Sequence, residues 1–347
     1  MKRRLLLLWV TGGALTAVAM ALGIVIGAVD IPFRAVAELL WSRLPWLGDA
    51  AWSQAWPAEF STILFQLRLP RVAMGAVVGA GLAVAGALFQ TLLRNPLGDP
   101  YLLGVSSGAG LGATLAMAFG ASTTLWGFSA ISGSALGMAL LTMAVVYGLA
   151  RVGGRVPTST LILSGVIVSS LCSALTLLAA TLHENRFTEI MMWLMGRLEV
   201  SDPRLLFVAA SIIGGSIGAA WLSARELNAL RFGEETAGHL GIGVERTKLI
   251  ILALASGMTA AAVSATGLIG FVGLMVPHAV RGLTGSSDHR LVVPGSAFGG
   301  AVLLVLADVA ARTLTAPIEL PVGVITALIG GPFFLILLRK ERKAMSW

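Results

Sequence analysis

Ten stretches of this chain are long and apolar enough to lie in a bilayer, and short charged segments separate them. Apolar residues make up 56% of the 347 residues and charged residues only 12%, so a water-soluble fold would leave large apolar patches exposed. The sequence therefore predicts an all-α polytopic membrane protein that forms a single domain over residues 1–347. The ten stretches cover approximately residues 5–29, 72–92, 101–119, 128–149, 158–181, 204–222, 248–268, 271–283, 292–311 and 320–338.

The first and the eighth stretches differ from the others. Residues 5–29 contain no charge and follow three basic residues. The alternative interpretation is a secretory signal peptide cleaved near residues 17–19, but the apolar run continues well past that position, which favours a span. Residues 271–283 are too few to cross a bilayer at about 1.5 Å per residue, so we expect a partial or buried helix there.

The distribution of Lys and Arg predicts the orientation of the chain. With the N-terminus in the cytoplasm, sixteen of the 24 basic residues lie on the cytoplasmic side and eight on the outer side, the bias of the positive-inside rule. An even number of spans then returns the C-terminus to the cytoplasm. The net charge of +7 follows from this topology and indicates no nucleic-acid partner. The eight outer residues are Arg34, Arg43, Arg68, Arg71, Arg186, Arg197, Arg204 and Arg312.

Many of the 42 glycines are four residues apart, which places small residues on one face of a helix. Such a face lets two backbones approach closely, although glycine-rich spans also produce these pairs by chance. Taken together, the pairs predict a tightly packed bundle. They are Gly75/Gly79, Gly104/Gly108/Gly112, Gly133/Gly137, Gly214/Gly218 and Gly295/Gly299.

Two parts of the chain resemble each other and predict an inverted internal repeat of spans 2–5 and 7–10. Arg71 in residues 61–200 and Arg246 in residues 246–340 each open a glycine- and alanine-rich span, which breaks at glycine and proline and then resumes. The leading spans of the two copies have opposite predicted orientations, as in many transporters. Residues 1–60 precede the first copy as one span and an outer loop, and residues 223–247 form the cytoplasmic segment before the second copy.

Polar groups within the spans are few. Asp308 and Arg312 are four residues apart and are expected to pair on one helix face. The hydroxyl-rich fifth span predicts either a polar conduit or hydroxyls bonded to their own helix carbonyls, and these alternatives stay open. There is no chain of buried carboxylates for an ion relay, which counts against a stand-alone carrier driven by an ion gradient. That carrier is the alternative function.

The sequence contains no pattern of a catalytic or metal site. The single Cys172 lies in the fifth span, and none of the four histidines has a metal-ligand neighbour one helical turn further on. A phosphate-binding loop is also missing from the sequence, so another chain would have to bind ATP. Residues 223–247 predict two short amphipathic helices joined by a turn, which would suit either a groove on a partner or a solvated connector.

Several strings resemble the FecCD-type permeases, the membrane subunits of type II ATP-binding-cassette importers for iron chelates, heme and cobalamin. The resemblance covers about residues 60–340 in order. The strings are Leu67-Arg68-Leu69-Pro70-Arg71, Arg94-Asn95-Pro96-Leu97-Gly98-Asp99-Pro100, Gly104-Val105-Ser106-Ser107-Gly108-Ala109-Gly110, the Trp193-Leu-Met-Gly196 segment, the Gly267 to His278 segment and the Glu319 to Ala327 segment.

The resemblance implies three groups of site residues. Arg68, Arg71 and Arg312 would lie at the outer surface and receive acidic residues of a substrate-binding protein. The turn with Asn95 and Leu97 and the start of span five would form the cytoplasmic gate, with Pro157 as a departure from the family pattern. By position, the span-five gate residues are Thr158 and Ser159. Residues 225–243 would couple to the ATPase through Leu230, Gly233, Glu234, Glu235, Gly238, Leu240 and Gly241.

The resemblance also implies the assembly and its function. The chain would form a homodimer in the lipid bilayer of the bacterial inner (cytoplasmic) membrane, with two copies of a separate ATPase that carry ATP and Mg²⁺. A periplasmic binding protein would deliver a metal chelate for import by alternating access. An iron–siderophore complex is favoured as substrate because it is the broadest group in the family, and heme and cobalamin are the alternatives. The chain itself would bind no cofactor and catalyse no reaction.

Overall fold

The computed structural model describes residues 2–27, 29–43, 56–121, 124–125, 128–200 and 202–345, most of which are helical. Seven helical segments among these residues are long and apolar enough to cross a membrane. They are α1 (Lys2–Val25), the continuous segment of α3 (Ala58–Thr62), η1 (Ile63–Arg68) and α4 (Leu69–Leu92), then α6 (Ala130–Ala150), α7 (Thr158–Leu182), α9 (Pro203–Leu222), α12 (Val244–Thr266) and α14 (His289–Thr313).

Three further helices complete the predicted ten. The shorter apolar helices are α5 (Val105–Ala118) and α15 (Val322–Met345), whose apolar part ends at Leu337. The third, α13 (Val272–Thr284), spans only about 20 Å and is the expected partial helix. The ten helices follow the predicted stretches in order, so the prediction of ten apolar segments is confirmed.

The remaining elements are short and lie at the ends of the bundle. Among them, α10 (Ala224–Leu230) and α11 (Glu234–His239) confirm the predicted pair of short helices between the sixth and seventh spans. The others are α2 (Phe33–Trp41), the 3₁₀ helices η2 (Pro100–Leu103) and η3 (Glu184–Arg186), α8 (Phe187–Leu194) and an antiparallel pair of two-residue strands, β1 (Thr124–Leu125) and β2 (Phe128–Ser129).

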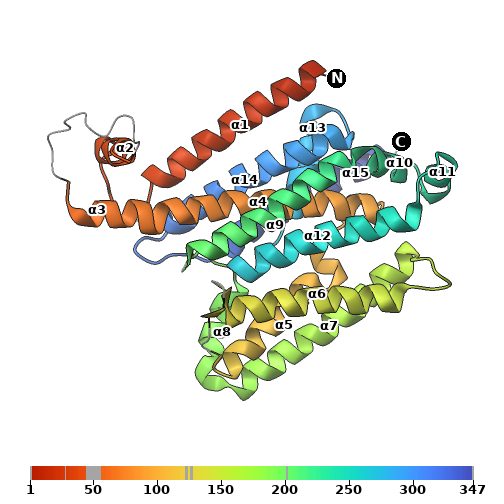
Figure 1. Cartoon of the computed structure of the whole chain (residues 1–347), viewed down its shortest axis with the longest axis horizontal. Coiled ribbons are helices and arrows are strands. Elements are labelled where there is room, and N and C mark those ends of the chain that lie inside the picture. The colour runs from red at the N-terminus through yellow and green to blue at the C-terminus, as the bar shows by residue number, and fades with distance from the viewer. Residues whose placement is uncertain are drawn as a thin grey trace.

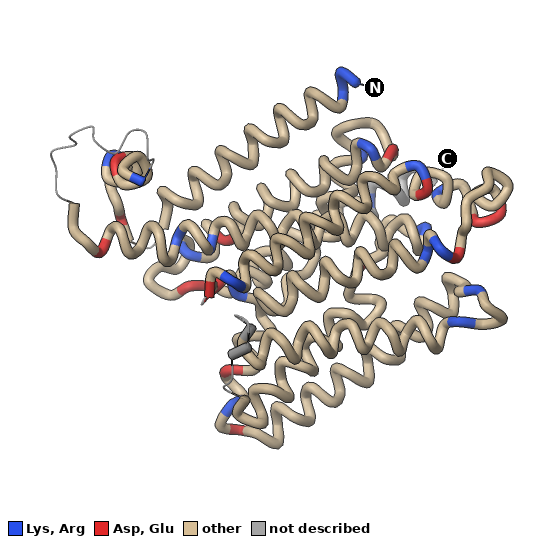
Figure 2. Tube along the Cα trace, in the orientation of Figure 1, with Lys and Arg blue, Asp and Glu red and all other residues tan. Residues whose placement is uncertain are grey.

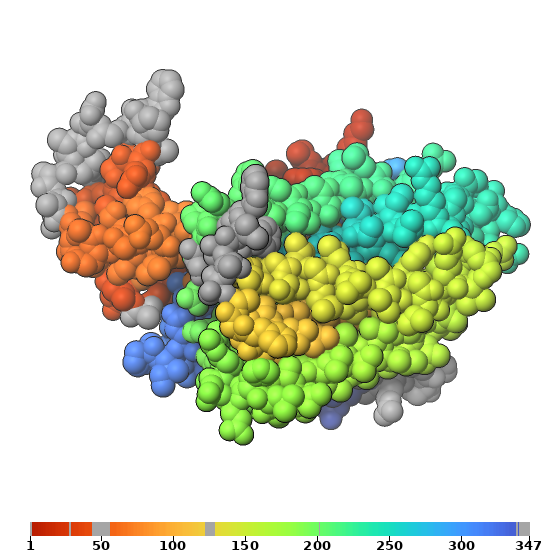
Figure 3. All heavy atoms as spheres, turned by 60° about the horizontal axis from the view of Figure 1, so that its bottom comes forward, coloured from red at the N-terminus to blue at the C-terminus, as the bar shows by residue number. Residues whose placement is uncertain are grey.

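Figure 1 shows α4 in the middle of the bundle. It packs against α14, α12, α13 and α9, while α5, α6 and α7 form a second group that meets α12. In the view of Figure 3, α6 and α7 (yellow to yellow-green) run along the near face of the molecule. Both described termini lie at the same end as α10 and α11, which we call the α10–α11 end; α2 and α3 mark the opposite, α2–α3 end (Figure 1). Charged residues gather at these two ends, and the helices between them carry few (Figure 2).

The helix that contains α4 is interrupted by a turn of π-helix. Residues 58–92 form one continuous helical segment of 35 residues, about 50 Å long, so its first turns extend beyond a bilayer core of about 30 Å. Pro70 lies in the first turn of α4, directly after the π-helical residues Ile63–Arg68. Because proline has no N–H and its ring crowds the carbonyl four residues earlier, the wider π turn accommodates it without ending the helix.

Glycines bring the central helices into backbone contact. Gly79 of α4 faces Gly300 of α14, and a methyl group on either would overlap the carbonyl oxygen of the other. A methyl group on Gly86 of α4 would likewise overlap the carbonyl oxygen of Gly273 of α13, and one on Gly273 would lie 2.9 Å from the carbonyl oxygen of Leu82. The predicted close packing is therefore confirmed here, but Gly133, Gly137, Gly214 and Gly218 have no neighbour within 4 Å of an added methyl group among the described atoms, so those two pairs do not pack within this chain.

The leading helices of the two predicted repeats run in opposite directions, as the prediction of an inverted repeat requires. In Figure 1, α4 runs from the α2–α3 end toward the α10–α11 end, and α12 runs the opposite way beside it. Both are followed by breaks: Arg94 adopts a positive φ of 48° after α4, and Gly267 and Phe271 adopt φ values of 72° and 67° after α12. The inverted relation of the whole segments 61–200 and 246–340 stays a prediction.

We expect Gly79→Ala to lower the free energy of unfolding by about 1–3 kcal/mol, because the added methyl group forces α4 and α14 apart. Thermal unfolding in detergent measures the effect. Gly214→Ala is the matched control, since its methyl group meets no described atom within 4 Å. Equal stability of the two variants would contradict the close crossing as a determinant of the fold.

Candidate functional site

A hollow of about 820 Å³ opens at the α2–α3 end of the bundle. It lies between the π-helical turn, the segment before α9 and the end of α14. Charged side chains from four parts of the chain line it, namely Arg68, Arg71, Arg197, Glu199, Arg312 and Glu319. The structure therefore brings the three predicted docking arginines together at one place.

A network of ion pairs centres on Asp308, which is buried. Arg71 Nε donates to Asp308 Oδ1 at 2.9 Å, and Arg312 Nε forms an ion pair with Oδ2 at a distance of 3.0 Å. Arg71 also pairs with Glu319 at 2.8 Å. The predicted pairing of Asp308 with Arg312 is confirmed. A carboxylate with two guanidinium partners is well compensated, whereas any one of these charges alone would be costly at such a buried position.

Arg68 and Arg312 are not at the surface, and the expected surface position is wrong for both. Each side chain is 4% exposed. Arg68 donates to the carbonyl oxygens of Ile24 at 3.0 Å and Val25 at 2.7 Å, and also to that of Val29, while Arg312 donates to Gly23 at 3.0 Å.

Both arginines are buried because they bind carbonyl groups at the C-terminal end of α1. The last carbonyl groups of a helix have no partner within that helix and attract cations, and these two arginines supply the donors. Docking of a binding protein at this end stays a prediction. The charged side chains still accessible in the hollow are Arg71, which is 19% exposed, Glu319 at 37%, and the exposed Arg197 and Glu199.

The predicted coupling residues lie at the α10–α11 end, but their side chains differ in accessibility. Leu230 is only 4% exposed and packs into the core, so the prediction that it contacts a partner is wrong: its position on α10 faces the bundle. Glu235, Gly238, Leu240 and Gly241 are exposed, and Glu234 is half-buried. Gly233 and Gly241 have φ values of 112° and 78°, and they end α10 and α11 with turns that favour glycine.

An exposed aromatic residue at this end was not among the predicted coupling residues. Phe232 is 73% exposed and Leu240 is 61% exposed, one on each side of α11. A lone phenylalanine in a charged connector was the signal that could have identified it. Two large apolar side chains in water beside a short helix are typical of a protein contact surface.

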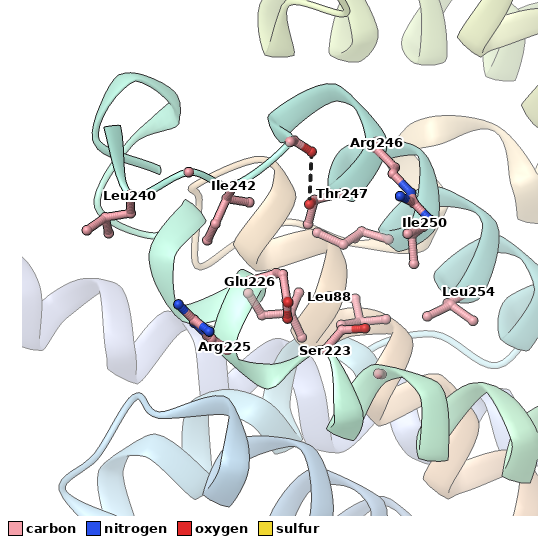
Figure 4. Close-up of a pocket in the computed structure, with 15 residues that line it drawn as sticks. Leu88, Ser223, Arg225, Glu226, Leu240, Ile242, Arg246, Thr247, Ile250 and Leu254 are labelled. Atoms are coloured by element: carbon pink, nitrogen blue, oxygen red, sulfur yellow. Dashed lines mark hydrogen bonds between the residues drawn. The ribbon is translucent and has the colours of Figure 1, made fainter. Parts of the chain in front are cut away.

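A second hollow, of about 460 Å³, lies beneath these helices (Figure 4). Apolar side chains from α4, α10 and α12 line it, and Arg225 and Arg246 lie at its edges. In Figure 4, Thr247 is hydrogen-bonded to the carbonyl oxygen of Gly243 at 3.0 Å. This bond closes the first turn of α12, so the hollow is bounded by regular structure.

The predicted gate residues occupy two separate turns at the α10–α11 end. Asn95 follows α4, and its side-chain oxygen accepts from the N–H of Leu97 at 2.9 Å, which fixes a tight turn with Leu97 43% exposed. Thr158 and Ser159 begin α7 directly after Pro157, where Pro157 takes the N-cap position. Whether these turns open and close stays a prediction.

The hydroxyl groups of α7 are partly accounted for. Ser170 and Thr176 donate to the carbonyl oxygens of Val166 and Cys172, four residues earlier, at 2.9 and 2.8 Å. For these two, the interpretation of hydroxyls bonded to their own helix is confirmed. The buried Ser169 hydroxyl has no partner among the described residues.

The described part of the chain offers no group of three or more His, Cys, Asp or Glu side chains that could hold a metal ion. The one buried carboxylate in the gate turn is Asp99, which is 8% exposed and accepts from the N–H of Tyr101 at 2.8 Å. Burial raises the pKa of the Asp99 carboxyl from 3.8 to about 6, and the bond from Tyr101 opposes this only in part.

The raised pKa of Asp99 predicts a pH dependence of stability. Below about pH 4 the carboxyl is protonated in both states, and between pH 4 and 6 only the folded state keeps its proton. Stability is therefore lost as the pH rises through this window, by about 3 kcal/mol in total. Asn at position 99 keeps an acceptor for Tyr101 but carries no charge.

We therefore expect Asp99→Asn to gain stability relative to the unsubstituted chain as the pH rises from 4.5 to 6.5. Thermal unfolding of both proteins at several pH values measures the difference, and the comparison cancels the titration of all other groups. Parallel curves for the two proteins would show that Asp99 titrates normally.

The chain matches the FecCD transport family over residues 15–340. It is 40% identical over 342 residues to the uncharacterized ABC transporter permease protein YvrB of Bacillus subtilis, with 97% of this chain and 95% of that one covered. Over 293 residues it is 46% identical to the cobalamin import system permease protein BtuC of Halobacterium salinarum, covering 83% and 77% of the two chains.

Two further comparisons agree with these. The hemin transport system permease protein HmuU of Yersinia pestis is 40% identical over 323 residues, with 92% and 91% of the two chains covered. A solved structure described as an inward-facing conformation of a metal-chelate type ABC transporter superimposes with a TM-score of 0.80 at 29% identity, over 97% of this chain and 99% of that one.

Proposed function

The chain belongs to the FecCD transport family, and we propose that it is the membrane-spanning permease subunit of an ATP-binding-cassette importer that moves a metal chelate into the cytoplasm. The observation that carries the proposal is the α10–α11 pair between the sixth and seventh spans. It presents exposed apolar side chains at the end of the bundle where both described termini lie (Figure 1). A permease driven by a separate ATPase needs such a contact surface.

The energy for transport comes from a partner in this proposal. Two copies of a separate ATPase carry ATP and Mg²⁺ and receive α11 in a groove at the cytoplasmic face. Their closure rocks rigid groups of helices about a central pathway, which alternates between the two sides of the membrane. The grouping of α5, α6 and α7 apart from α1, α4 and α14 supports such rigid-body motion (Figure 1).

A second copy of the chain encloses the pathway with it. The fifth-span helix α7 supports this part of the proposal, because large apolar side chains are exposed along it and only a few of its residues are buried within this chain. Part of this exposed surface contacts the second copy of the chain in the homodimer, and the rest contacts the lipid of the cytoplasmic membrane. Both termini lie in the cytoplasm, as the distribution of basic residues predicts.

The substrate is a metal chelate captured by an extracytoplasmic binding protein. The relatives named above include permeases for cobalamin and for hemin, and a further relative is the iron(3+)-hydroxamate permease FhuB of Bacillus subtilis. An iron–siderophore complex is the first to test, since it is the broadest group in the family, with cobalamin and heme as alternatives. Specificity lies mainly in the binding protein, because the described spans carry few charged side chains and offer no group of three or more metal-ligating side chains.

A stand-alone carrier driven by an ion gradient is the competing function. It would work without an ATPase and would need ionisable groups along the pathway. In the described residues, the buried carboxylate of the spans, Asp308, is held in ion pairs near the α2–α3 end. This favours a structural role for it and supports the importer.

Purification of the tagged chain from native membranes in mild detergent tests the proposal. We expect an ATPase with a phosphate-binding loop to co-purify, identified by mass spectrometry. Any binding protein captured with it is then tested for stimulation of ATP hydrolysis with ferric siderophore, heme and cobalamin in turn. Recovery of the chain alone would favour the ion-driven carrier.

Replacing Phe232 and Leu240 with serine should reduce the recovered ATPase at least about tenfold, because the contact loses two apolar side chains worth about 1.5–3 kcal/mol each when buried. The ratio of the two proteins in the purified complex measures this. Leu283→Ser is the matched control, since Leu283 is 88% exposed on α13 outside the α10–α11 segment. Equal recovery of the ATPase with the unsubstituted chain, the double variant and Leu283→Ser would place the ATPase contact elsewhere.

The hollow at the α2–α3 end predicts the docking site of the binding protein. Arg197→Glu should reduce the stimulation of ATP hydrolysis by that protein several-fold while the basal rate persists, because it reverses an accessible charge in the hollow. Arg204→Glu makes the same change on an exposed residue that does not line the hollow. If the two variants are stimulated equally, docking does not use the hollow. Arg68 is unsuitable for this test because it holds the end of α1.

A further inference from the structure

A buried lysine lies at the base of α12, between elements that are far apart in the sequence. Lys248 is 4% exposed in its side chain. Its ammonium group donates to Glu234 Oε2 of α11 at 2.6 Å, to the carbonyl oxygen of Val156 at 2.9 Å and to Glu245 Oε1 at 3.1 Å. An ammonium group has three N–H donors, so its hydrogen-bonding capacity is filled.

Val156 is held from both sides by this cluster. Its carbonyl oxygen accepts from Lys248, and its N–H donates to Glu245 Oε2 at 3.0 Å. The residue is only 2% exposed and lies two positions before the first residue of α7. The charged pair of Lys248 and Glu245 therefore fixes the backbone from which α7 begins.

Glu234 extends the same cluster to a third element. Its second carboxylate oxygen, Oε1, lies 3.6 Å from Arg94 Nη2. Arg94 has a positive φ of 48° in the turn after α4 and directly precedes Asn95. Glu234 thus reaches both turns that are predicted to form the gate. It pairs directly with Arg94, and it reaches the turn before α7 through Lys248, which donates to Val156.

The two short helices are attached to different parts of the bundle. From α10, Asn228 donates to Asp288 at 2.8 Å, and Arg231 donates to the carbonyl oxygen of Ser287 at 2.7 Å, so α10 is joined to the turn between α13 and α14. From α11, Glu234 joins α12, the start of α7 and the turn after α4. The polar contacts of α11 therefore reach the start of α7 and the turn after α4, which those of α10 do not, although α10 also packs against α4 and α12.

We propose that Lys248 is a positioning residue that makes the start of α7 follow the movement of α11. The reason is the cost of separating a buried charge from its partners, which is several-fold larger than that of breaking an exposed pair. If α11 moved alone, Lys248 would lose Glu234 and stay buried with a partly uncompensated charge. Movement of α11, the base of α12 and Val156 as one unit avoids that cost. The coupling role rests on the proposed function, while the mechanical link stands on the contacts alone.

Hydrogen–deuterium exchange of the chain in lipid nanodiscs tests the link without any partner. Lys248→Met keeps the length of the side chain and removes its charge. We expect the amide of Val156, within residues 151–157, to exchange about tenfold faster or more, because the held backbone loses a charge-assisted hydrogen bond. Arg246→Met is the control: it removes the same charge from the same helix, but Arg246 is exposed and has no ion pair in the described structure.

Unchanged exchange of residues 151–157 in Lys248→Met, or the same increase in Arg246→Met, would overturn the proposal. Should Lys248→Met fail to fold, Glu245→Met takes its place, because it removes both the oxygen that accepts the Val156 N–H and the oxygen that accepts from Lys248. We expect the same peptide to lose protection in that variant, and full retention of protection would likewise overturn the link.

The coupling role is then tested in the complex with the co-purified ATPase. Spin labels on exposed positions 155 of the loop and 236 of α11, in a Cys172→Ala background, report the distance between the two segments. We expect this distance to be the same with and without vanadate-trapped nucleotide, and to change only when Lys248 is replaced by Met. Independent movement in the unsubstituted chain would overturn the coupling. Failure to recover any ATPase would refute the proposed function, while the exchange result would still decide the link.

Discussion

The close crossing of α4 with α14 and α13 is the contact on which the rest of the bundle depends. In a bilayer, lipid tails are as apolar as leucine, so helices gain little from the hydrophobic effect and associate through van der Waals packing. Gly79 with Gly300 and Gly86 with Gly273 allow backbones to touch, and the many atoms brought into contact supply that packing. With α4 enclosed in this way, the other helices are arranged around it, and their ends define the two sites.

Charge is confined to the ends of the bundle, and each end uses it differently. At the α2–α3 end, Arg68 and Arg312 cap the last carbonyls of α1, while Asp308 balances Arg71 and Arg312. At the α10–α11 end, Lys248 draws α11, α12 and the loop before α7 together. The first network holds a peripheral helix in place, and the second connects an exposed helix to the segments beneath it.

Much of the fold was predictable because the bilayer restricts the choice of structure. Every backbone group must be satisfied within a segment, so apolar runs of the right length become helices, and their order and approximate bounds follow from the sequence. The short eighth helix and the pair of Asp308 with Arg312 were predictable for the same local reasons, namely helix rise and a four-residue spacing. The candidate site was predictable only through resemblance to a family, which located its segments but not the accessibility of its side chains.

The predictions that failed concern contacts between distant segments. Arg68 and Leu230 were expected to face partners, yet one caps α1 and the other packs into the core. Neither outcome can be read from neighbouring residues, because it depends on which carbonyls or side chains arrive from 40 or more positions away. The indole of Trp56 donates to Glu38 of α2 at 2.7 Å across 18 positions, which is another contact that neighbouring residues do not predict.

The sequence by itself determined the solvent of this protein, the number and order of its apolar helices, the two short helices between the sixth and seventh spans and the family to which the chain belongs. These are properties of local composition and spacing, which the bilayer converts directly into structure. Only the tertiary structure decided which charged groups are buried, which are accessible, and that Lys248 joins α11 to the start of α7. Those depend on the close packing of helices far apart in the chain, since burial and partners are set by neighbours in space.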